Sequence, residues 1–257
     1  MIDTNVDLFQ WPFRRIAGDD PASLVALLRK KGVTQAWASS YEAMLHRDVA
    51  GVNIRLADAC RKHGPNFLIP FGTVNPKEPD WQDDVRRCAE VHKMPGIRLH
   101  PNYHGYTLDE PAAAEVLTLA ASHKLVVQIA LMMEDTRVQF ALMQVPTVNP
   151  APLVDLMKRM PDLRLELLNA GYSGGGETGH MKELGQLENV YFDIAHQEGV
   201  GGVARLIKQT SASRVLFGSN FPFFYFESSL LKVREAGLTK EETHAVMDGN
   251  AQAFLKH

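Results

Sequence analysis

Short apolar segments recur along this chain, and each is followed by a longer segment whose apolar residues have helix-like spacing. Eight such runs, rich in Val, Ile, Leu and Phe, start about 30 residues apart, a spacing typical of repeated βα units. Right-handed crossovers join such strands into a parallel sheet. The runs span residues 2–9, 33–39, 67–74, 96–100, 125–131, 163–169, 190–196 and 215–220.

A closed barrel explains these eight units better than an open sheet does. The last run matches the first in apolar character, neither half of the chain looks like a separate domain, and 257 residues is close to the usual length of a (β/α)8 barrel. A doubly wound sheet is the alternative, but no GxGxxG fingerprint follows the first run. The sequence therefore predicts the α/β class, with one parallel eight-stranded TIM-barrel domain over residues 1–257.

Helix boundary signals support these units. Asp20 is expected to cap a helix over residues 21–31 that begins with a proline and stops at Gly32. A second helix, over residues 49–63, is expected to end at Gly64 in the same manner.

Charge and composition argue against several kinds of partner. Lys and Arg number 27 against 30 Asp and Glu, and the resulting net charge of -3 gives no basis for binding a nucleic acid. No run approaches the roughly 20 apolar residues that cross a bilayer, and no signal peptide is seen. Cys60 and Cys88 form neither a disulfide framework nor a CxxC metal clip. We expect a cytoplasmic protein that binds a small-molecule substrate, and neither nucleic acid nor membrane, with a homo-oligomer left open.

Polar residues stand where most of the predicted strands end. In a parallel barrel these ends meet at one mouth, where active sites form. A polar side chain buried there costs roughly 1–3 kcal/mol unless something satisfies it, so a group of them indicates a ligand site. The glycine-rich segment over residues 171–179 is interpreted as a flexible loop, with a phosphate cradle as the alternative. The polar residues are Asn5, Asp7, Ser39, Ser40, Asn75, Arg98, His100, Asn169, His196 and Asn220.

Six sequence blocks, spread over almost the whole chain, are MIDTNVD, GIRLHPNY, LLNAGY, NVYFD, RVLFGSNFP and GNAQAFL. In this order they resemble the signature blocks of the amidohydrolase-related family of metal-dependent TIM-barrel hydrolases and carboxy-lyases. The family pattern has a His-x-His pair on the first strand, one His on each of several later strands, and an Asp at the end of the eighth. At these positions the chain instead has Asn5, Asp7, Ala130, Asn169 and Asn220.

The resemblance implies a divalent metal held by imidazole and carboxylate ligands, for which neutral amides are poor substitutes. Only Asp7 keeps a strong ligand, and Asn220 stands where the family has the carboxylate that resembles a general base. We therefore expect no metal at the family's position and no other cofactor. The family includes members that hydrolyse lactones without a metal, so catalysis does not depend on these ligands alone.

Three residues are candidates for catalysis. Asp7 is a candidate general base if burial raises its pKa, and the alternative is a structural acceptor for Arg14 or Arg98. His100 lies two residues after Arg98, so the two side chains point the same way and form a candidate clamp for a carboxylate or carbonyl. His196 is a candidate acid or base, and the alternative is a packing residue.

Further residues are candidates for substrate binding. Arg98 is expected to grip a carboxylate, with a buried ion pair to Asp7 as the alternative. Arg14, in the WPFRR segment after the first run, is expected to cover an anionic ligand or else to lie in solvent. The aromatic segment over residues 221–226 is expected in the core, in an oligomer contact or in a pocket wall. The remaining predicted ligands are the amides Asn5, Asn169 and Asn220.

Together these residues and the resemblance predict a lactonase-like hydrolase for a small, anionic carbonyl compound of the lactone or ester type. In this prediction Asp7 activates water, and Arg98 and His100 bind the substrate carboxylate and stabilise the developing oxyanion. The three amides serve as further preorganised donors. A carboxy-lyase or isomerase on the same barrel is one alternative. A non-catalytic ligand-binding barrel is another, since a fold does not fix a function.

Overall fold

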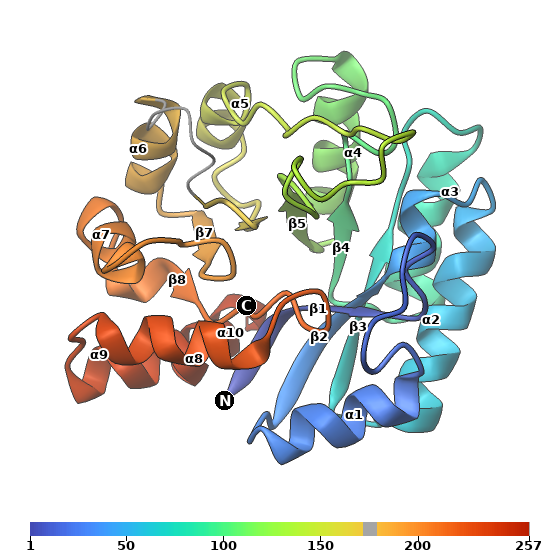
Figure 1. Cartoon of the computed structure of the whole chain (residues 1–257). Helices are drawn as coiled ribbons and strands as arrows, with labels where there is room; N and C mark the ends of the chain where they lie inside the picture. The colour runs from blue at the N-terminus through green and yellow to red at the C-terminus, as the bar shows by residue number, and fades with distance from the viewer. Residues whose placement is uncertain (172–178, 257) are drawn as a thin grey trace.

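The computed structural model describes residues 1–171 and 179–256, and it confirms a parallel eight-stranded barrel (Figure 1). The strands follow one another around the sheet in chain order, and each neighbouring pair is parallel. Most of the glycine-rich segment, residues 172–178, lies outside the described residues. The strands are β1 (Ile2–Leu8), β2 (Gln35–Ser40), β3 (Leu68–Thr73), β4 (Gly96–Leu99), β5 (Val126–Ala130), β6 (Leu165–Leu168), β7 (Val190–Asp193) and β8 (Val215–Leu216).

The sheet closes between its last and first strands. The backbone N–H of Thr4 donates to the carbonyl oxygen of Phe217 at 2.9 Å, and Val6 forms a parallel bridge with Phe221 further along the same edge. This bridge places Asn220, one residue earlier, beside the C-terminal half of β1.

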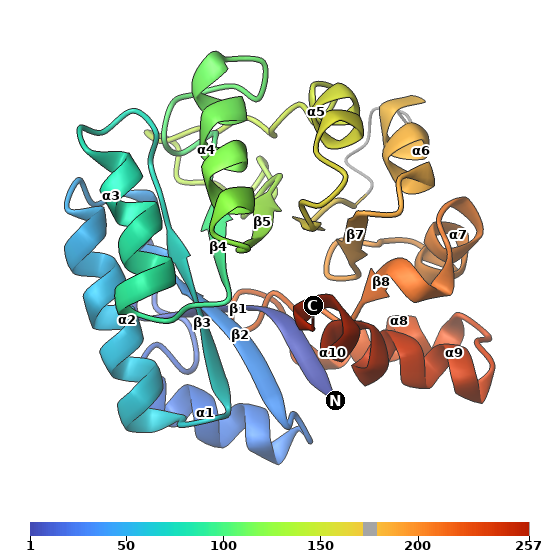
Figure 2. The same cartoon turned by 180° about the vertical axis from the view of Figure 1, so that it is seen from behind.

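Helices surround the barrel, as two opposite views show (Figures 1 and 2). The predicted caps are confirmed: the Asp20 carboxylate accepts hydrogen bonds from the backbone N–H groups of Ala22 and Ser23, and the second helix ends at Gly64. Capping of this kind satisfies N–H groups that have no partner within the helix. The helices are α1 (Pro21–Lys30), α2 (Val49–His63), α3 (Trp81–Arg86), α4 (Pro111–Ser122), α5 (Leu153–Arg159), α6 (Gly179–Gln186), α7 (Gly202–Gln209), α8 (Phe226–Glu235), α9 (Lys240–His244) and α10 (Asn250–Leu255).

Two strands, β7 and β8, end three and four residues before their predicted apolar runs do. β7 ends at Asp193 because a turn follows, in which the N–H of Gln197 donates to the carbonyl of Ile194, so His196 lies in this turn. β8 covers only two residues, and Asn220 lies beyond it with a left-handed backbone, φ 53°. Asn adopts this conformation more readily than most residues, and it allows a local bend before Phe221 meets β1 again.

The bottom of the barrel, at the N-terminal ends of the strands, is filled by α10. Phe254 from this helix stacks on Trp37 with ring centroids 5.8 Å apart, and Trp37 stacks on Phe71 at 5.2 Å. These rings belong to a buried cluster that also contains Ile2 from the first strand. The opposite end is therefore the one at which a ligand can enter. In the described ranges 1–171 and 179–256, no helix is long and apolar enough to cross a membrane.

Candidate active site

The predicted site residues lie at the C-terminal ends of the strands, where a parallel barrel brings them to one mouth. Seven of the eight have relative exposures of 5% or less, and only Arg14 lies at the rim with its side chain 47% exposed. The buried residues are Asn5 and Asp7 in β1, Arg98 in β4, His100 directly after β4, Asn169 directly after β6, His196 after β7 and Asn220 after β8.

Arg98 and Asp7 form a buried ion pair, which is the alternative that the sequence left open. The Arg98 Nη1 atom lies 3.0 Å from Asp7 Oδ2, and both side chains are at most 1% exposed. Arginine has five N–H groups, and here each has an acceptor within the barrel. These acceptors are Asp7 Oδ2, Gln128 Oε1 and the carbonyl oxygens of Thr4, Val6 and Trp37. In this arrangement Arg98 orients Asp7 and has no N–H group left over for a substrate.

Asp7 keeps one oxygen that Arg98 does not use. Its Oδ1 atom is buried and has no hydrogen-bond partner within the described ranges. Burial raises the pKa of this carboxyl, and the neighbouring Arg98 guanidinium opposes the increase. An ionised carboxylate with a raised pKa and a free oxygen is suited to accept a proton from water.

The three predicted amides differ in how firmly they are held. The Asn5 Nδ2 group donates to Asn169 Oδ1 at 2.9 Å and to Asp193 Oδ2 at 2.7 Å, and the backbone N–H of Asn169 donates to Asp193 Oδ1 at 2.9 Å. Asp193, at the end of β7, thus holds the side-chain amide of Asn5 and the backbone of Asn169. The side-chain amide of Asn169 is held by Asn5 and by the carbonyl oxygen of Met132, to which its Nδ2 donates at 2.7 Å. Asn220 contrasts with them, because neither atom of its buried amide has a hydrogen-bond partner among the residues described. Of the three side chains, Asn220 is therefore the one whose amide nitrogen and oxygen are both available to bind a ligand.

The two predicted histidines are buried and neutral. Burial holds the pKa of His100 well below its usual value, and neither ring nitrogen has a partner in the part of the chain that the structure describes. Burial lowers the pKa of His196 to about 3, its Nε2 atom is likewise unpaired there, and its ring packs 4.5 Å from that of Phe224. A neutral imidazole carries one donor and one acceptor, so each ring can exchange a proton with a bound ligand.

An aromatic cluster lies at the rim of the mouth, formed by Trp11, Tyr41, Tyr103 and Phe223. Trp11 is its centre, with ring centroids 5.6 Å from Tyr41, 6.3 Å from Tyr103 and 4.9 Å from Phe223. Arg14 lies over the Phe223 ring, with its guanidinium carbon 4.8 Å from the centroid. The position of Phe223 is thus consistent with the pocket wall that was one expectation for segment 221–226. Phe226, from the same segment, packs in the main core.

Arg14 is held by an acidic residue that the sequence did not single out. Its Nη2 atom lies 3.3 Å from Glu134 Oε1, and Glu134 is only 4% exposed. Burial raises the pKa of Glu134, and Arg14 opposes the increase. Because Glu134 belongs to the loop after β5 and Arg14 to the loop after β1, this ion pair joins two loops across the rim.

Several polar residues of the site were missed in the sequence, although a signal for some of them was present. Glu166 interrupts the apolar run of β6 and Gln128 that of β5, and polar residues inside apolar strands are what marked the other candidates. Asp193 was within a predicted run but not at its expected end. Tyr41 carried no local signal, because an aromatic residue in a loop is as often core as site. Trp11 begins the WPFRR segment, which the sequence had already marked as a candidate cover for an anionic ligand.

The residues at the mouth do not fit the divalent metal that the family resemblance implies. Within the described residues, no three His, Cys, Asp or Glu side chains gather as a metal-binding group. At the implied ligand positions the chain has amides and Ala130, and the one carboxylate, Asp7, is paired with Arg98. Neutral amides and a single paired carboxylate do not match the imidazole and carboxylate set that zinc or a similar ion prefers.

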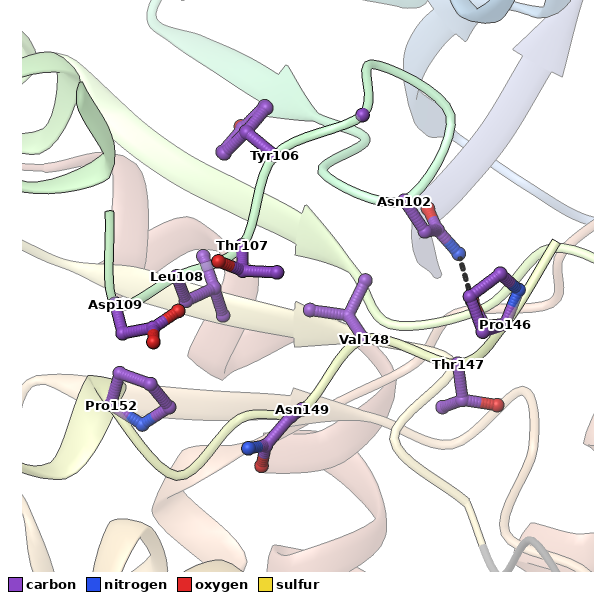
Figure 3. Close-up of a pocket in the computed structure, with 11 residues that line it drawn as sticks. Asn102, Tyr106, Thr107, Leu108, Asp109, Pro146, Thr147, Val148, Asn149 and Pro152 are labelled. Atoms are coloured by element: carbon purple, nitrogen blue, oxygen red, sulfur yellow. Dashed lines mark hydrogen bonds between the residues drawn. The ribbon is translucent and has the colours of Figure 1, made fainter. Parts of the chain in front are cut away.

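A cavity lies outside the mouth, between the loops that leave β4 and β5 (Figure 3). Its volume is about 450 Å³, and a hydrogen bond of 2.8 Å from Asn102 Nδ2 to the carbonyl oxygen of Pro146 joins its two sides. Tyr106, Asp109 and Val148 are among its lining residues. None of the predicted site residues lines it.

Comparison with known proteins agrees with this fold. A protein-family model described as Amidohydrolase matches residues 7–256. No curated protein sequence matches the chain.

Solved structures with the same fold include two decarboxylases. A mutant of 5-carboxyvanillate decarboxylase from Novosphingobium aromaticivorans, with bound manganese, is 16% identical over 100% of this chain and 97% of its own, with a TM-score of 0.76. The 2,6-dihydroxybenzoate decarboxylase from Rhizobium is 13% identical over 98% of both chains, with a TM-score of 0.74.

A hydrolase is also among them. A probable 2-pyrone-4,6-dicarboxylic acid hydrolase from Acinetobacter baumannii, with citric acid bound, is 13% identical over 99% of this chain and 98% of its own, with a TM-score of 0.70. At these identities the structures share the fold with this chain. The family model, which spans nearly the entire sequence, shows that this chain belongs to the amidohydrolase family.

Proposed function

We propose that this protein hydrolyses a small carbonyl compound of the lactone or ester type that carries an anionic group, without the metal centre implied by the family resemblance. The observation that carries the proposal is the free Oδ1 atom of Asp7, buried among other polar atoms that have no partner within the described ranges. Buried polar groups are nearly always paired, so an unpaired group of this size is best explained by a ligand. The other unpaired atoms include those of His100, His196 and Asn220.

In the proposed reaction, Asp7 Oδ1 takes a proton from a water molecule as the water oxygen attacks the substrate carbonyl carbon. The electron pair of the carbonyl double bond moves to its oxygen, and the free amide of Asn220 donates a hydrogen bond to this oxyanion. Collapse of the tetrahedral intermediate breaks the bond to the leaving oxygen. That oxygen receives the proton held by Asp7, either directly or through the ring of His100 or His196, which takes this proton on one nitrogen as it releases the proton on the other. The products are a carboxylic acid and an alcohol, and Asp7 is returned to its ionised form.

The remaining predicted residues position these groups or bind the substrate. Arg98 holds Asp7 at 3.0 Å and so fixes the direction of its free oxygen. Asn5 and Asn169 form the floor of the site, where Asp193 accepts from the side chain of Asn5 and from the backbone N–H of Asn169. Arg14, the one partly exposed cation of the set, is placed to attract an anionic group to the mouth.

The structural relatives support a small carboxylated carbonyl compound as the substrate class. The Acinetobacter baumannii protein is described as a probable hydrolase of a pyrone dicarboxylic acid, and a pyrone is a cyclic ester. Cys60 and Cys88 are buried free thiols, which supports the proposed cytoplasmic location.

Decarboxylation is the second candidate function. The aromatic cluster of Trp11, Tyr41, Tyr103 and Phe223 gives the mouth a wall suited to a flat ring, and two of the structural relatives are described as decarboxylases of ring carboxylates. In that reaction the unpaired groups would orient a carboxylate, and no water would be activated.

A panel of small lactones and esters, each with and without a carboxylate substituent, tests the proposal. We expect hydrolysis with a preference for the carboxylated members, and Asp7→Asn should lower kcat by a factor of about 10²–10⁴ because it removes the base. Asp162→Asn, at an exposed position, is the matched control. Release of CO2 from hydroxybenzoates, with no lactone hydrolysis, would favour the second candidate, and neither activity would favour a non-catalytic binding protein.

A further inference from the structure

Two hydrogen-bond donors in the aromatic cluster have no acceptor among the residues that the structure describes. The indole Nε1 of Trp11 and the hydroxyl of Tyr41 are buried without a partner in the described part of the chain, in residues that are 3% and 0% exposed. An indole N–H can only donate, so no rearrangement of hydrogens satisfies it from within. A buried unpaired donor is costly, and such groups in a native protein require an explanation.

The packing of the cluster holds both donors in place. Trp11, Tyr41 and Phe223 form a triangle with centroid distances of 5.6, 4.9 and 5.4 Å, and they come from the loops after β1, β2 and β8. Rings packed edge to face in this way have little rotational freedom. The donors are therefore oriented before any ligand arrives, which reduces the entropy lost on binding.

A cation lies beside the two donors. Arg14 sits over the Phe223 ring at 4.8 Å, and its Nε and Nη2 groups donate to Glu134. Across the described ranges, its Nη1 group makes no hydrogen bond. Tyr41 is close enough to respond to the charges of Arg14 on the rim and of Asp7 inside the barrel. Tyr41 is thus within electrostatic range of both the proposed base and the rim cation, and its ring and that of Trp11 pack on the Phe223 ring that Arg14 covers.

We propose that Trp11 Nε1–H, Tyr41 O–H and Arg14 form a carboxylate subsite against the Phe223 ring. This inference rests on the proposed function, and it makes the substrate a carbonyl compound whose carboxylate lies on the rim side of the reacting carbon. Two neutral donors and one guanidinium match the lone pairs of a carboxylate, and hydrogen bonds to a charged acceptor are stronger than neutral ones. Arg98 was the expected carboxylate ligand, but its N–H groups are all engaged within the barrel.

Binding of benzoate and of benzamide, which has a similar shape without the charge, tests the subsite without any turnover. Wild-type protein should bind benzoate more tightly than benzamide in calorimetric titrations. Tyr41→Phe and Trp11→Phe each remove a donor and keep a ring, and each should weaken benzoate binding by about tenfold to a hundredfold. Arg14→Gln should abolish the preference for the charged probe. Tyr106→Phe is the control and should leave benzoate binding unchanged, because it removes a buried hydroxyl that has no partner among the described residues and lies at the separate cavity between the loops after β4 and β5.

Thermal stability gives a second readout. If Tyr41 only stabilised the fold, the Tyr41→Phe substitution would lower the Tm. In the absence of ligand, Tyr41→Phe removes an unpaired buried group, so its Tm should equal or exceed that of the wild type. A lowered Tm with unchanged benzoate affinity would overturn the inference, as would a wild type that binds neither probe. Selective benzoate binding without lactone hydrolysis would keep the subsite and reject the proposed function. Hydrolysis of carboxylated lactones with unchanged kcat and KM in Tyr41→Phe would keep the proposed function and reject the subsite.

Discussion

Glu166 should make the stability of this protein depend on pH in the neutral range. This residue lies inside the barrel on β6 with no exposure, and burial raises its pKa to about 8. Its Oε1 lies 2.5 Å from Thr4 Oγ1, and its Oε2 accepts a hydrogen bond of 2.6 Å from Gln128 Nε2. With a proton on Oε1, Glu166 donates to the Thr4 hydroxyl, which can in turn donate to the carbonyl of Phe217 at 3.4 Å. The neutral acid therefore fits the folded structure.

The magnitude follows from the difference between the folded and unfolded pKa values. The reference value for this side chain is 4.5, so between 4.5 and about 8 the folded protein holds a proton that the unfolded chain releases. The unfolding free energy then falls as pH rises through this interval, because the native state binds more protons. From pH 6 to pH 9 the loss from Glu166 is about 3 kcal/mol. For a chain of this size that corresponds to a decrease in Tm of about 6–12 °C.

Glu166→Gln isolates this effect, because the amide reproduces the neutral acid and its hydrogen bonds. Melting curves followed by circular dichroism over the same pH range should show the variant losing about 3 kcal/mol less stability than the wild type. Asp3, whose pKa burial raises to about 7, keeps part of the slope in both proteins. Glu115→Gln, at an exposed position of α4, is the control. Parallel curves for wild type and Glu166→Gln would refute the reasoning, since they would mean that Glu166 is ionised in both states.

Three further substitutions test separate parts of the structure. Arg98→Met leaves Asp7 buried without its ion pair, so chemical denaturation should show a loss of about 3–5 kcal/mol; a loss below about 1 kcal/mol would contradict the pairing. Gly171→Ala places a Cβ against the backbone carbonyl of His196 and should lower the unfolding free energy by about 1–3 kcal/mol, whereas an unchanged Tm would show that this contact relaxes freely. Asp20→Ala removes the cap of α1 and should cost about 0.5–2 kcal/mol in the same denaturation assay, with full stability arguing against the cap.

The sequence by itself determined the architecture of this protein. Apolar periodicity, helix caps and the regular spacing of strands are local properties, and they predicted all eight strands and the bounds of the second helix. They also placed polar residues at one end of the barrel, because parallel strands share the direction of their ends. Strand ends were less certain: β7 stops at Asp193 because a turn begins there, and apolar character continues through the turn.

Tertiary structure decided how the site residues are used. From its sequence position, Arg98 could bind a substrate or pair with Asp7. The fold settles its five hydrogen bonds, because three of the acceptors lie on β1, one on β2 and one on β5. Trp11, Tyr41 and Phe223 meet only because three loops far apart in the chain converge at the mouth. Local periodicity shows which face of a helix or strand is buried. It does not show which residues of other elements pack against that face, and those residues determine the hydrogen-bond partners of a buried polar group.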